Sequence, residues 1–310
     1  MSQYDAIIIG AGPAGITAAL YMVRSGCKVA LVEKLTQGGQ VLQTESIENY
    51  PGFPKGIKGY ELADAFAAHL EELELDRFSE GVNDIEFGDD KHSLHKVLVG
   101  KDWHEARTIL ICSGAKHSHL GIENELKLNG RGVSYCAICD GNFYRGLEVA
   151  VVGGGNTALE EALYLAKIVK KVYLVHRRED FRGAKVYVDR LIATENVEII
   201  RNTVVKAIHG DDVLTGLTLQ NVKENTEREL VVDGFFVFVG IKPSIDFIPD
   251  VLEKDERGFI YTDTEMRTNI SGVFAAGDIR SKLCRQVSTA VGDGATAAQA
   301  AFLYMEENDA

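Results

Sequence analysis

The sequence predicts an α/β protein built from two Rossmann-like domains of three layers each, one inserted into the other. Residues 5–33 and 147–177 repeat a single plan: a short apolar strand, a glycine-rich turn, an amphipathic helix and a second strand. The two turns begin at residues 10 and 153, too far apart to be the two halves of one domain. A third strand and glycine turn, ending near residue 278, indicates that the chain returns to the first domain.

The first repeat begins with an apolar strand at residues 6–9 and the turn GAGPAG at residues 10–15. Apolar residues then recur at helical spacing over residues 16–23. The second strand, residues 28–32, ends on Glu33.

The second repeat has the same order of elements. Its strand at residues 149–152 leads into the turn GGGNTA at residues 153–158, and a helix continues to about residue 165. The next strand, residues 172–175, ends on a basic run, HRR at residues 176–178.

The remaining segments alternate between helix and strand patterns. Apolar residues between 62 and 73 line one face of a helix, and two strands follow at 97–99 and 108–111. After residue 195 the pattern is rich in strands, at 197–200, 213–219 and 230–239.

No proline-rich linker marks the domain boundaries, because the chain has only five prolines. We place the boundaries near residues 114–115 and 241–243. The prediction is a split domain of residues 1–114 and 245–310, with an inserted domain of residues 115–244 that carries the CxxC pair described below.

Composition narrows the class of protein. The net charge of −13 argues against nucleic-acid binding, which requires cationic side chains to neutralise phosphates. No apolar run approaches the ~18 residues that a membrane helix needs, so no membrane association is expected. A start without a basic or apolar leader predicts a cytoplasmic protein. Five cysteines do not resemble a secreted disulfide framework, and a close pair in a reducing compartment is more often catalytic or metal-binding.

The first glycine turn has the pattern of a dinucleotide site. Backbone amides and the dipole of the following helix stabilise a pyrophosphate, and glycine lets the backbone approach it closely. Glu33 lies where a carboxylate would accept both ribose hydroxyls and repel a 2′-phosphate. FAD or NAD therefore fits this turn, and NADP does not; the alternative is a glycine turn used only for packing.

The second turn predicts the opposite preference. Arg177 takes the position where an NAD-binding protein carries its acid, and Arg178 and Arg182 lie close in sequence. Guanidinium groups bind phosphate in a bidentate manner, so this cluster suits the 2′-phosphate of NADPH. The alternative is a solvated basic turn.

A Cys-x-x-Cys pair, Cys136 and Cys139, lies between the two turns in sequence. Such a pair can be redox-active, zinc-binding or merely buried. His117 and His119 could complete a Cys2His2 zinc set, although a dithiol between two electron-carrying sites favours redox chemistry. Asp140 follows directly, and a carboxyl group there could exchange a proton with a thiolate.

The third glycine turn ends on Asp278, which could hydrogen-bond a ribityl hydroxyl of a flavin. Two nucleotide sites and a dithiol together indicate that electrons pass from NADPH through a flavin to a disulfide.

At this point the sequence resembles the bacterial low-molecular-weight thioredoxin reductases along nearly its whole length. The matching segments occur in the order of that family: the turn at 10–15, GGQ at 38–40, NYPGF at 49–53, GVSYCAICDG at 132–141, the turn at 153–158, HRR at 176–178 with Arg182, AAGD at 275–278 and RQV at 285–287. Two segments depart from the family pattern. Residues 112–115 replace Ala-Thr-Gly-Ala, and residues 122–125 replace a Pro-Gly-Glu segment.

The resemblance implies a set of site residues. The FAD contacts would be Gly10, Gly12, Pro13, Ala14, Gly15, Glu33, Lys34, Gly38, Gly39, Gln40, Asn49, Val82, Gly114, Gly277, Asp278, Arg285, Gln286 and Val287. The NADPH contacts would be Gly153, Gly155, Asn156, Thr157, His176, Arg177, Arg178 and Arg182.

The resemblance also implies the catalytic roles. Cys139 would take electrons from the flavin, Cys136 would attack the disulfide of thioredoxin or a thioredoxin-like protein, and Asp140 would protonate the leaving thiolate. Because nicotinamide and dithiol both travel on the inserted domain, the two domains would rotate between half-reactions. A homodimer is also implied.

Three other functions remain open on the sequence alone. A reductase of another disulfide or of a peroxidase partner would share this core. A non-catalytic NADPH-binding redox sensor would bind the cofactors without steady-state NADPH consumption. The third is a binding protein whose CxxC pair holds a structural zinc ion, and metal analysis of the purified protein would detect that zinc.

Overall fold

The computed structural model describes residues 2–44 and 47–309, which form two compact units. Unit 1 comprises Met1–Lys116 and Lys242–Ala310, and unit 2 comprises His117–Ile241. The chain passes between the units through two short strands that pair with each other, β7 (Ala115–His117) and β16 (Ile241–Pro243). Among the described residues, no helix is both long enough and apolar enough to cross a membrane.

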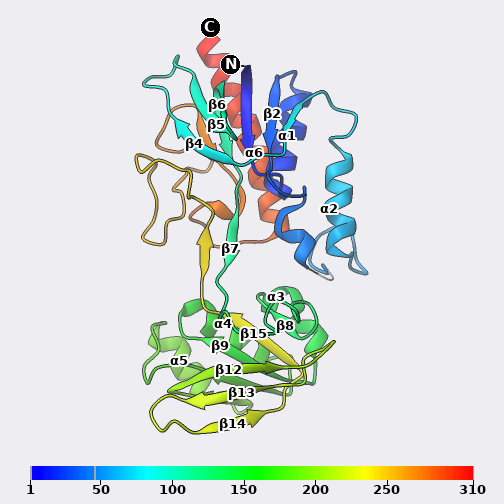
Figure 1. The fold of residues 1–310 in the computed structure, drawn as a ribbon, viewed down its shortest axis with the longest axis vertical. Helices are drawn as coiled ribbons and strands as arrows, with labels where there is room; N and C mark the ends of the chain where they lie inside the picture. Colours follow the sequence, from blue (N-terminus) through cyan, green and yellow to red (C-terminus); the bar gives the residue numbers. More distant parts are fainter. Residues whose placement is uncertain (1, 45–46, 310) are drawn as a thin grey trace. The chain divides into compact units, whose positions relative to one another are not determined.

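Unit 1 is built on a seven-stranded sheet (Figure 1). The strands β3, β2, β1, β6 and β17 run parallel, while β5 and β4 continue the sheet in antiparallel pairing. Their bounds are β1 Gln3–Ile9, β2 Val29–Val32, β3 Asp76–Phe78, β4 Val82–Glu86, β5 His95–Val99, β6 Asp102–Ile111 and β17 Val273–Ala275. The helices are α1 Pro13–Arg24, η1 Gly39–Gln43, α2 Gly59–Ala68, η3 Gly277–Ile279 and α6 Val287–Asp309.

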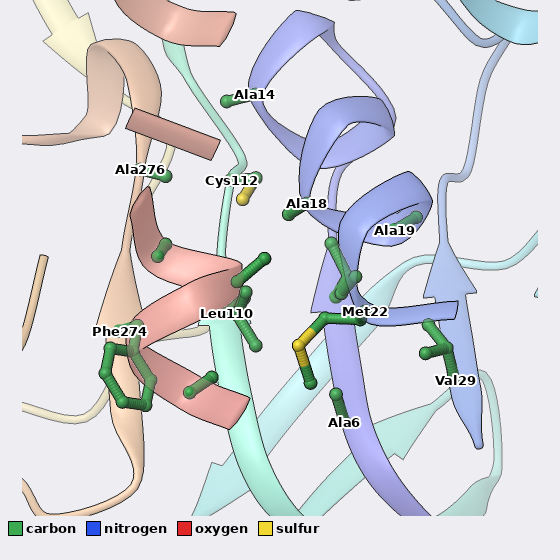
Figure 2. Packing of buried hydrophobic residues seen from close by; sticks show 14 of the residues in the cluster. Ala6, Ala14, Ala18, Ala19, Met22, Val29, Leu110, Cys112, Phe274 and Ala276 are labelled. Atoms are coloured by element: carbon green, nitrogen blue, oxygen red, sulfur yellow. The ribbon is translucent and has the colours of Figure 1, made fainter. Parts of the chain in front are cut away.

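The two faces of the unit 1 sheet carry separate cores, because successive residues of a strand point to opposite faces. Ala6 and Ile8 of β1 pack in the cluster that includes α1 and α6, whereas Ile7 and Ile9 pack with apolar residues from 245 to 279. Figure 2 shows the first cluster, in which small residues such as Ala14 and Ala18 line α1. A Cβ at Gly294 would lie 2.2 Å from the carbonyl oxygen of Ala14, so the backbones of α6 and α1 approach closely.

Unit 2 has a five-stranded parallel sheet in the order β11-β10-β9-β15-β8. An antiparallel sheet of β12, β13 and β14 covers one face, and α4 and α5 cover the other (Figure 1). The strands are β8 Val133–Ser134, β9 Glu148–Gly153, β10 Lys171–Val175, β11 Val197–Ile200, β12 Thr203–His209, β13 Gly216–Asn221, β14 Glu227–Leu230 and β15 Gly234–Phe238. The helices are α3 Ala137–Asp140, η2 Gly141–Tyr144, α4 Asn156–Ala166 and α5 Lys185–Ile192.

Several elements differ from their expected limits. The helix expected over residues 62–73 ends at Ala68, and Leu70 and Leu73 reach the core from the turns that follow. The strand expected over 213–219 is shifted to Gly216–Asn221. The apolar run at 230–239 divides between β14 and β15, since Val231 is exposed and interrupts the strand pattern.

Candidate nucleotide and dithiol sites

The first glycine turn joins β1 to α1 with its glycines in different surroundings. A Cβ at Gly15 would lie 1.8 Å from the carbonyl oxygen of Gly10, so this position tolerates no side chain. A Cβ at Gly12, the N-cap of α1, would meet no described atom closer than 4.0 Å. Protein packing therefore explains Gly15, whereas the bare surface at Gly12 fits the close approach of a pyrophosphate.

Glu33 stands at the end of β2 and faces this turn. Its Oε2 accepts the N–H of Ala11 at 2.9 Å, and its Oε1 accepts the N–H of Leu35 at 3.0 Å. Each carboxylate oxygen has further lone pairs, which can accept ribose hydroxyls. A pocket of about 140 Å³ opens beside it, lined by Leu31, Glu33, Leu35, Gln37, Arg77, Phe78 and Ser79.

Other residues expected to contact FAD gather around the same turn. The N–H of Gly38 donates to the carbonyl oxygen of Ala11 at 2.7 Å. A Cβ at Gly39, the residue before Gln40, would lie 3.1 Å from the Cα of Gly12, which places one backbone directly against the other. Pro13 and Ala14 form the first turn of α1. A Cβ at Gly277 would lie 2.9 Å from that of Ala14, so the third glycine turn also meets the first.

Residues distant in sequence meet at the start of α6. The side-chain amide of Asn49 donates to Gln286 Oε1 at 3.0 Å. Val287, the first residue of α6, packs with the cluster around Val41. The Arg285 guanidinium donates to the carbonyl oxygens of Asp278, Arg280 and Lys282, and so holds the loop before α6 in place.

The expected residues Lys34, Val82 and Gly114 lie at strand ends. Lys34 follows Glu33, and its side chain would contact a Cβ at Gly81, immediately before Val82 of β4. Gly114 follows β6, and a Cβ at this position would have open space around it, with no described atom within 4 Å. The structure therefore groups Lys34 with Val82 beside the end of β2.

Asp278 is the clearest sign that unit 1 binds a polar ligand. Its Oδ1 is buried and makes no hydrogen bond within the described residues, and Lys282 Nζ lies 3.8 Å away. Burial raises the pKa of this carboxyl group. An unpaired buried acceptor is costly, so the position fits a hydroxyl donor such as a ribityl group.

The second glycine turn joins β9 to α4. A Cβ at Gly153 would lie 2.5 Å from that of Ala158, and one at Gly154 would lie 2.2 Å from the His176 ring. A Cβ at Gly155, the N-cap of α4, would meet no atom of residues 2–44 and 47–309 within 4 Å. Gly155 thus matches Gly12 in having an open face at a helix N-terminus.

The basic residues expected to bind NADPH gather beside this turn. The N–H of Arg182 donates to the carbonyl oxygen of Gly154 at 2.8 Å, and Asn156 Oδ1 accepts the N–H of Ala184 at 2.7 Å. Thr157 is the next residue of α4. In the part of the chain that the structure describes, no carboxylate pairs with Arg182 or with the exposed pair that follows His176, namely Arg177 and Arg178. These three guanidinium groups remain available for an anion.

His176 supports the turn. Its Nε2 lies 3.1 Å from the carbonyl oxygen of Asp180, and its ring stacks on Phe181 with 4.7 Å between centroids. Burial lowers the pKa of this imidazole. A neutral ring packed under Gly154 is therefore a structural support, and the charge at this site comes from the arginines.

Cys136 and Cys139 are joined by a disulfide. Cys136 is the N-cap of α3, and its sulfur accepts the N–H of Cys139 at 3.2 Å. The hydroxyl of Ser134 accepts the N–H of Cys136 at 3.1 Å and donates to Asp140 Oδ2 at 2.6 Å. One hydroxyl thus connects the carboxylate of Asp140 to the backbone of Cys136.

The two histidines proposed as zinc ligands are engaged elsewhere. The His117 ring stacks on Tyr135, and His119 Nδ1 lies 2.8 Å from the Tyr135 hydroxyl, which also donates to Glu125 at 3.0 Å. The described residues contain no group of three or more side chains that could hold a metal ion. With its thiols in a disulfide, the CxxC pair lacks the ligands of the zinc alternative.

Sequence reasoning missed several residues of these sites. Ser134 gives a weak signal, as a hydroxyl two residues before an N-cap. Glu161, whose carboxylate accepts the N–H of Ala137, gives none, because the contact joins α4 to α3 across 24 residues. Arg77 and Ser79 line the pocket only through the pairing of β3 with β2.

The remaining cysteines are Cys27, Cys112 and Cys284, and all are free thiols. Cys112 lies in the core cluster shown in Figure 2, and burial raises its pKa. It acts as a small apolar side chain there.

Comparison with known proteins places these features in a family. Residues 4–294 match the family described as pyridine nucleotide-disulphide oxidoreductase. The thioredoxin reductase of Listeria monocytogenes is 43% identical over 98% of this chain and 94% of its own length. That of Bacillus subtilis is 41% identical over 98% of this chain and 95% of its own length.

Solved structures of thioredoxin reductases are also similar to this chain. The thioredoxin reductase of Streptococcus pyogenes is 44% identical, covers 99% of both chains and superposes with a TM-score of 0.93. The Lactococcus lactis thioredoxin reductase in its FR conformation is 42% identical over 98% of this chain and 99% of its own, with a TM-score of 0.66.

Proposed function

Because the chain belongs to the pyridine nucleotide-disulphide oxidoreductase family, we propose that it is an NADPH-dependent flavoprotein that reduces the disulfide of thioredoxin. The resemblance, the fold class and the oxidoreductase chemistry expected from the sequence are confirmed. A flavin and a pyridine nucleotide follow from the family. The finer assignment of FAD to unit 1 and NADPH to unit 2 is our proposal.

One observation carries the proposal: a CxxC disulfide and a cluster of three arginines beside a glycine turn occupy the same compact unit. Arg177, Arg178 and Arg182 would hold the 2′-phosphate of NADPH, while the open faces of Gly155 and Gly12 would each admit a pyrophosphate. In unit 1, Glu33 would accept the ribose hydroxyls of FAD and Asp278 a ribityl hydroxyl. The proposed domains are residues 1–114 with 245–310 for FAD, and residues 115–244 for NADPH.

FAD, when bound, supplies the transfer of two electrons from the nicotinamide to the disulfide. Two electrons and two protons convert Cys136–Cys139 into two thiols. Cys136, as a thiolate, attacks one sulfur of thioredoxin and forms a mixed disulfide, and Cys139 then attacks the sulfur of Cys136. The enzyme disulfide forms again, and thioredoxin leaves as a dithiol.

Asp140 would supply the proton for the departing thiolate. Its hydrogen bond from Ser134 fixes the carboxyl group relative to the backbone of Cys136. The protonated acid would then deliver its proton to the departing sulfur.

Rotation of the two domains would let one flavin meet both nicotinamide and dithiol. Two solved relatives of nearly equal identity, 44% and 42%, differ in TM-score, 0.93 against 0.66, although both are covered almost completely. Relatives of this sequence therefore occur in more than one overall arrangement, which supports rotation. A cross-link between the two domains should block turnover, and undiminished turnover of the cross-linked protein would remove the rotation model.

The partner and setting are also proposals. Thioredoxin or a thioredoxin-like protein is the expected substrate, as the names of the relatives suggest. A homodimer rests on the resemblance alone. Three free thiols fit a reducing compartment such as the cytoplasm.

The decisive experiment is a visible spectrum of the purified protein, before and after NADPH and then with thioredoxin. We expect a flavin spectrum that NADPH bleaches and thioredoxin restores. Cys139→Ser should abolish thioredoxin reduction while NADPH still bleaches the flavin, and Cys284→Ser, at an exposed free thiol, should behave as the unmodified protein. Disulfide reduction retained in Cys139→Ser would refute the dithiol assignment, and bleaching without any steady-state NADPH consumption would favour the redox sensor.

A further inference from the structure

Glu161 of α4 reaches across to the CxxC segment. Its Oε2 accepts the N–H of Ala137 at 3.0 Å, and the N–H of Ile138 donates to the same carboxylate. These are the first two amides after Cys136, at the start of α3. The helix that begins at the second glycine turn is thereby tied directly to the redox pair.

The hydrogen bonds to Glu161 occupy backbone amides that could otherwise stabilise a thiolate at Cys136. At the start of a helix, free N–H groups stabilise a cysteine thiolate and lower its pKa. Here Glu161 occupies the amides of Ala137 and Ile138, and the Cys139 N–H is directed at the sulfur of Cys136. A carboxylate that is hydrogen-bonded to the amide directly after Cys136 also disfavours a second negative charge on the Cys136 side chain.

We propose that Glu161 is a positioning residue for the redox pair: its carboxylate holds the backbone after Cys136 against α4, and its charge limits the fraction of reduced Cys136 that is present as the thiolate that attacks thioredoxin. The inference rests on the proposed function, in that the disulfide is reduced during turnover. A protonated Cys136 would resist small oxidants between turnovers, since the thiolate is the reactive form.

Besides Glu161, α3 and the elements packed against it carry two other carboxyl groups, those of Asp140 and Glu160. The elements packed against α3 are α4 and η2, and their titratable side chains, with that of α3 itself, are Asp140, Tyr144, Glu160, Glu161 and Tyr164. Burial raises the pKa of Glu161, and the charge of Glu160 adds to this. The coupling is reciprocal: a carboxylate at 161 raises the pKa of the Cys136 thiol, and a thiolate there raises the pKa of Glu161 further.

The test measures the reactivity of Cys136 in the full-length protein. A Cys139→Ser background keeps Cys136 reduced, and the rate of its alkylation by iodoacetamide is followed by peptide mass spectrometry from about pH 5 to about pH 9. Glu161→Gln retains an oxygen that can accept the two N–H groups but removes the charge. We expect its alkylation profile to move about one pH unit lower and its rate near neutral pH to rise about threefold, because a lower thiol pKa also reduces nucleophilicity.

Glu160→Gln is the matched control, since it removes the same charge at the preceding residue, which is exposed. It should leave the profile of Cys136 within error of the parent. A Glu161→Gln profile that coincides with the parent and with Glu160→Gln would overturn the proposal.

If Glu161→Gln fails to fold, a second variant still tests the proposal. Glu161→Asp keeps the charge but withdraws it by one methylene, so it should give a smaller acceleration than the rise of about threefold expected for Glu161→Gln, and an acceleration as large as that rise would also overturn the proposal. The assay requires no flavin, NADPH or thioredoxin. Failure of the proposed function would instead appear in the spectrum and in thioredoxin reduction, so the two failures are distinguishable.

Discussion

The two glycine turns both join a strand to a helix, but different kinds of side chain hold them in place. In unit 1, a carboxylate, Glu33, accepts an N–H from inside the turn. In unit 2, a neutral imidazole, His176, packs under Gly154, and the charged groups lie beyond it on the surface.

The third position of the fingerprint differs for a physical reason. Gly15 would place a Cβ 1.8 Å from the carbonyl oxygen of Gly10, whereas Ala158 carries its Cβ in a buried position. The second turn therefore leaves more room between helix and strand. The middle glycines, Gly12 and Gly155, are alike in both turns and have no described side chain to avoid. This comparison separates glycines that serve packing from glycines that serve a ligand.

The largest expected effect is on Gly15. Gly15→Ala should destabilise unit 1 by at least about 4 kcal/mol, because its methyl group meets backbone that cannot move aside. The matched change Ala158→Gly in unit 2 should cost only about 1 kcal/mol. Chemical unfolding followed by hydrogen exchange in each unit measures both, and equal effects would contradict the difference in packing.

The next effect concerns the arginines. Arg177→Ala combined with Arg178→Ala should raise the KM for NADPH by about a hundredfold, since two charge-assisted contacts to phosphate are worth about 3 kcal/mol. The KM for NADH should change little, because NADH has no 2′-phosphate. Steady-state kinetics with both cofactors decide this, with Arg190→Ala on α5 as the control. A similar rise for NADH would contradict the phosphate assignment.

Acid should weaken unit 1 through His95. This ring is 1% exposed, its Nδ1 accepts the N–H of Gly88 at 3.1 Å, and burial lowers its pKa to about 4. The unfolded chain binds a proton near pH 6.5, so the stabilisation by neutral His95 is full above about pH 6.5 and is lost as the pH falls toward about 4. We expect a loss of about 2–3 kcal/mol over this range in thermal or urea unfolding.

His95→Gln should flatten that pH dependence, and His92→Gln, at an exposed position, should preserve it. His117 in unit 2 has a pKa lowered to about 4 by burial as well, so part of the acid sensitivity should survive in the His95 variant. An unchanged slope in His95→Gln would show that unit 1 does not depend on this ring.

The smallest effect on stability is expected at the middle glycines. Gly12→Ala and Gly155→Ala should each cost about 0.5–1 kcal/mol, because alanine is a poorer N-cap residue than glycine. Each should nevertheless lose one cofactor, with Gly12→Ala releasing the flavin and Gly155→Ala weakening NADPH binding. Calorimetry together with cofactor titration checks this, and loss of both cofactors in either variant would contradict the assignment of one turn to each.

Much of the fold could be read from local patterns. The strand, turn and helix around each glycine fingerprint were predicted to within three residues at each end, because glycine spacing and apolar periodicity are both local signals. The long helix α6 was not predicted, since its residues are small and packed on several sides and show weak periodicity. The run at 230–239 was misread as one strand because its apolar residues outweighed the turn signal of Asp233-Gly234, which separates β14 from β15.

The departure at residues 122–125 also needed the structure. Asn124 takes φ of 67°, a left-handed conformation that asparagine tolerates better than most residues. Glu125 is 1% exposed and accepts the N–H groups of Leu120 and Gly121. The altered segment is therefore firmly anchored, which the sequence alone could not indicate.

The sequence by itself determined the two nucleotide fingerprints, the acid at 33, the arginines at 177, 178 and 182, and the cysteine pair, because each depends on residue types at short fixed spacings. Tertiary structure alone decided that Glu161 meets the CxxC segment, that Asn49 meets Gln286, and that Asp278 buries an oxygen to which no described residue donates. The reason is that hydrogen bonds between distant segments form only when the sheets and helices have packed. The burial that increases the free energy of such bonds also arises only then.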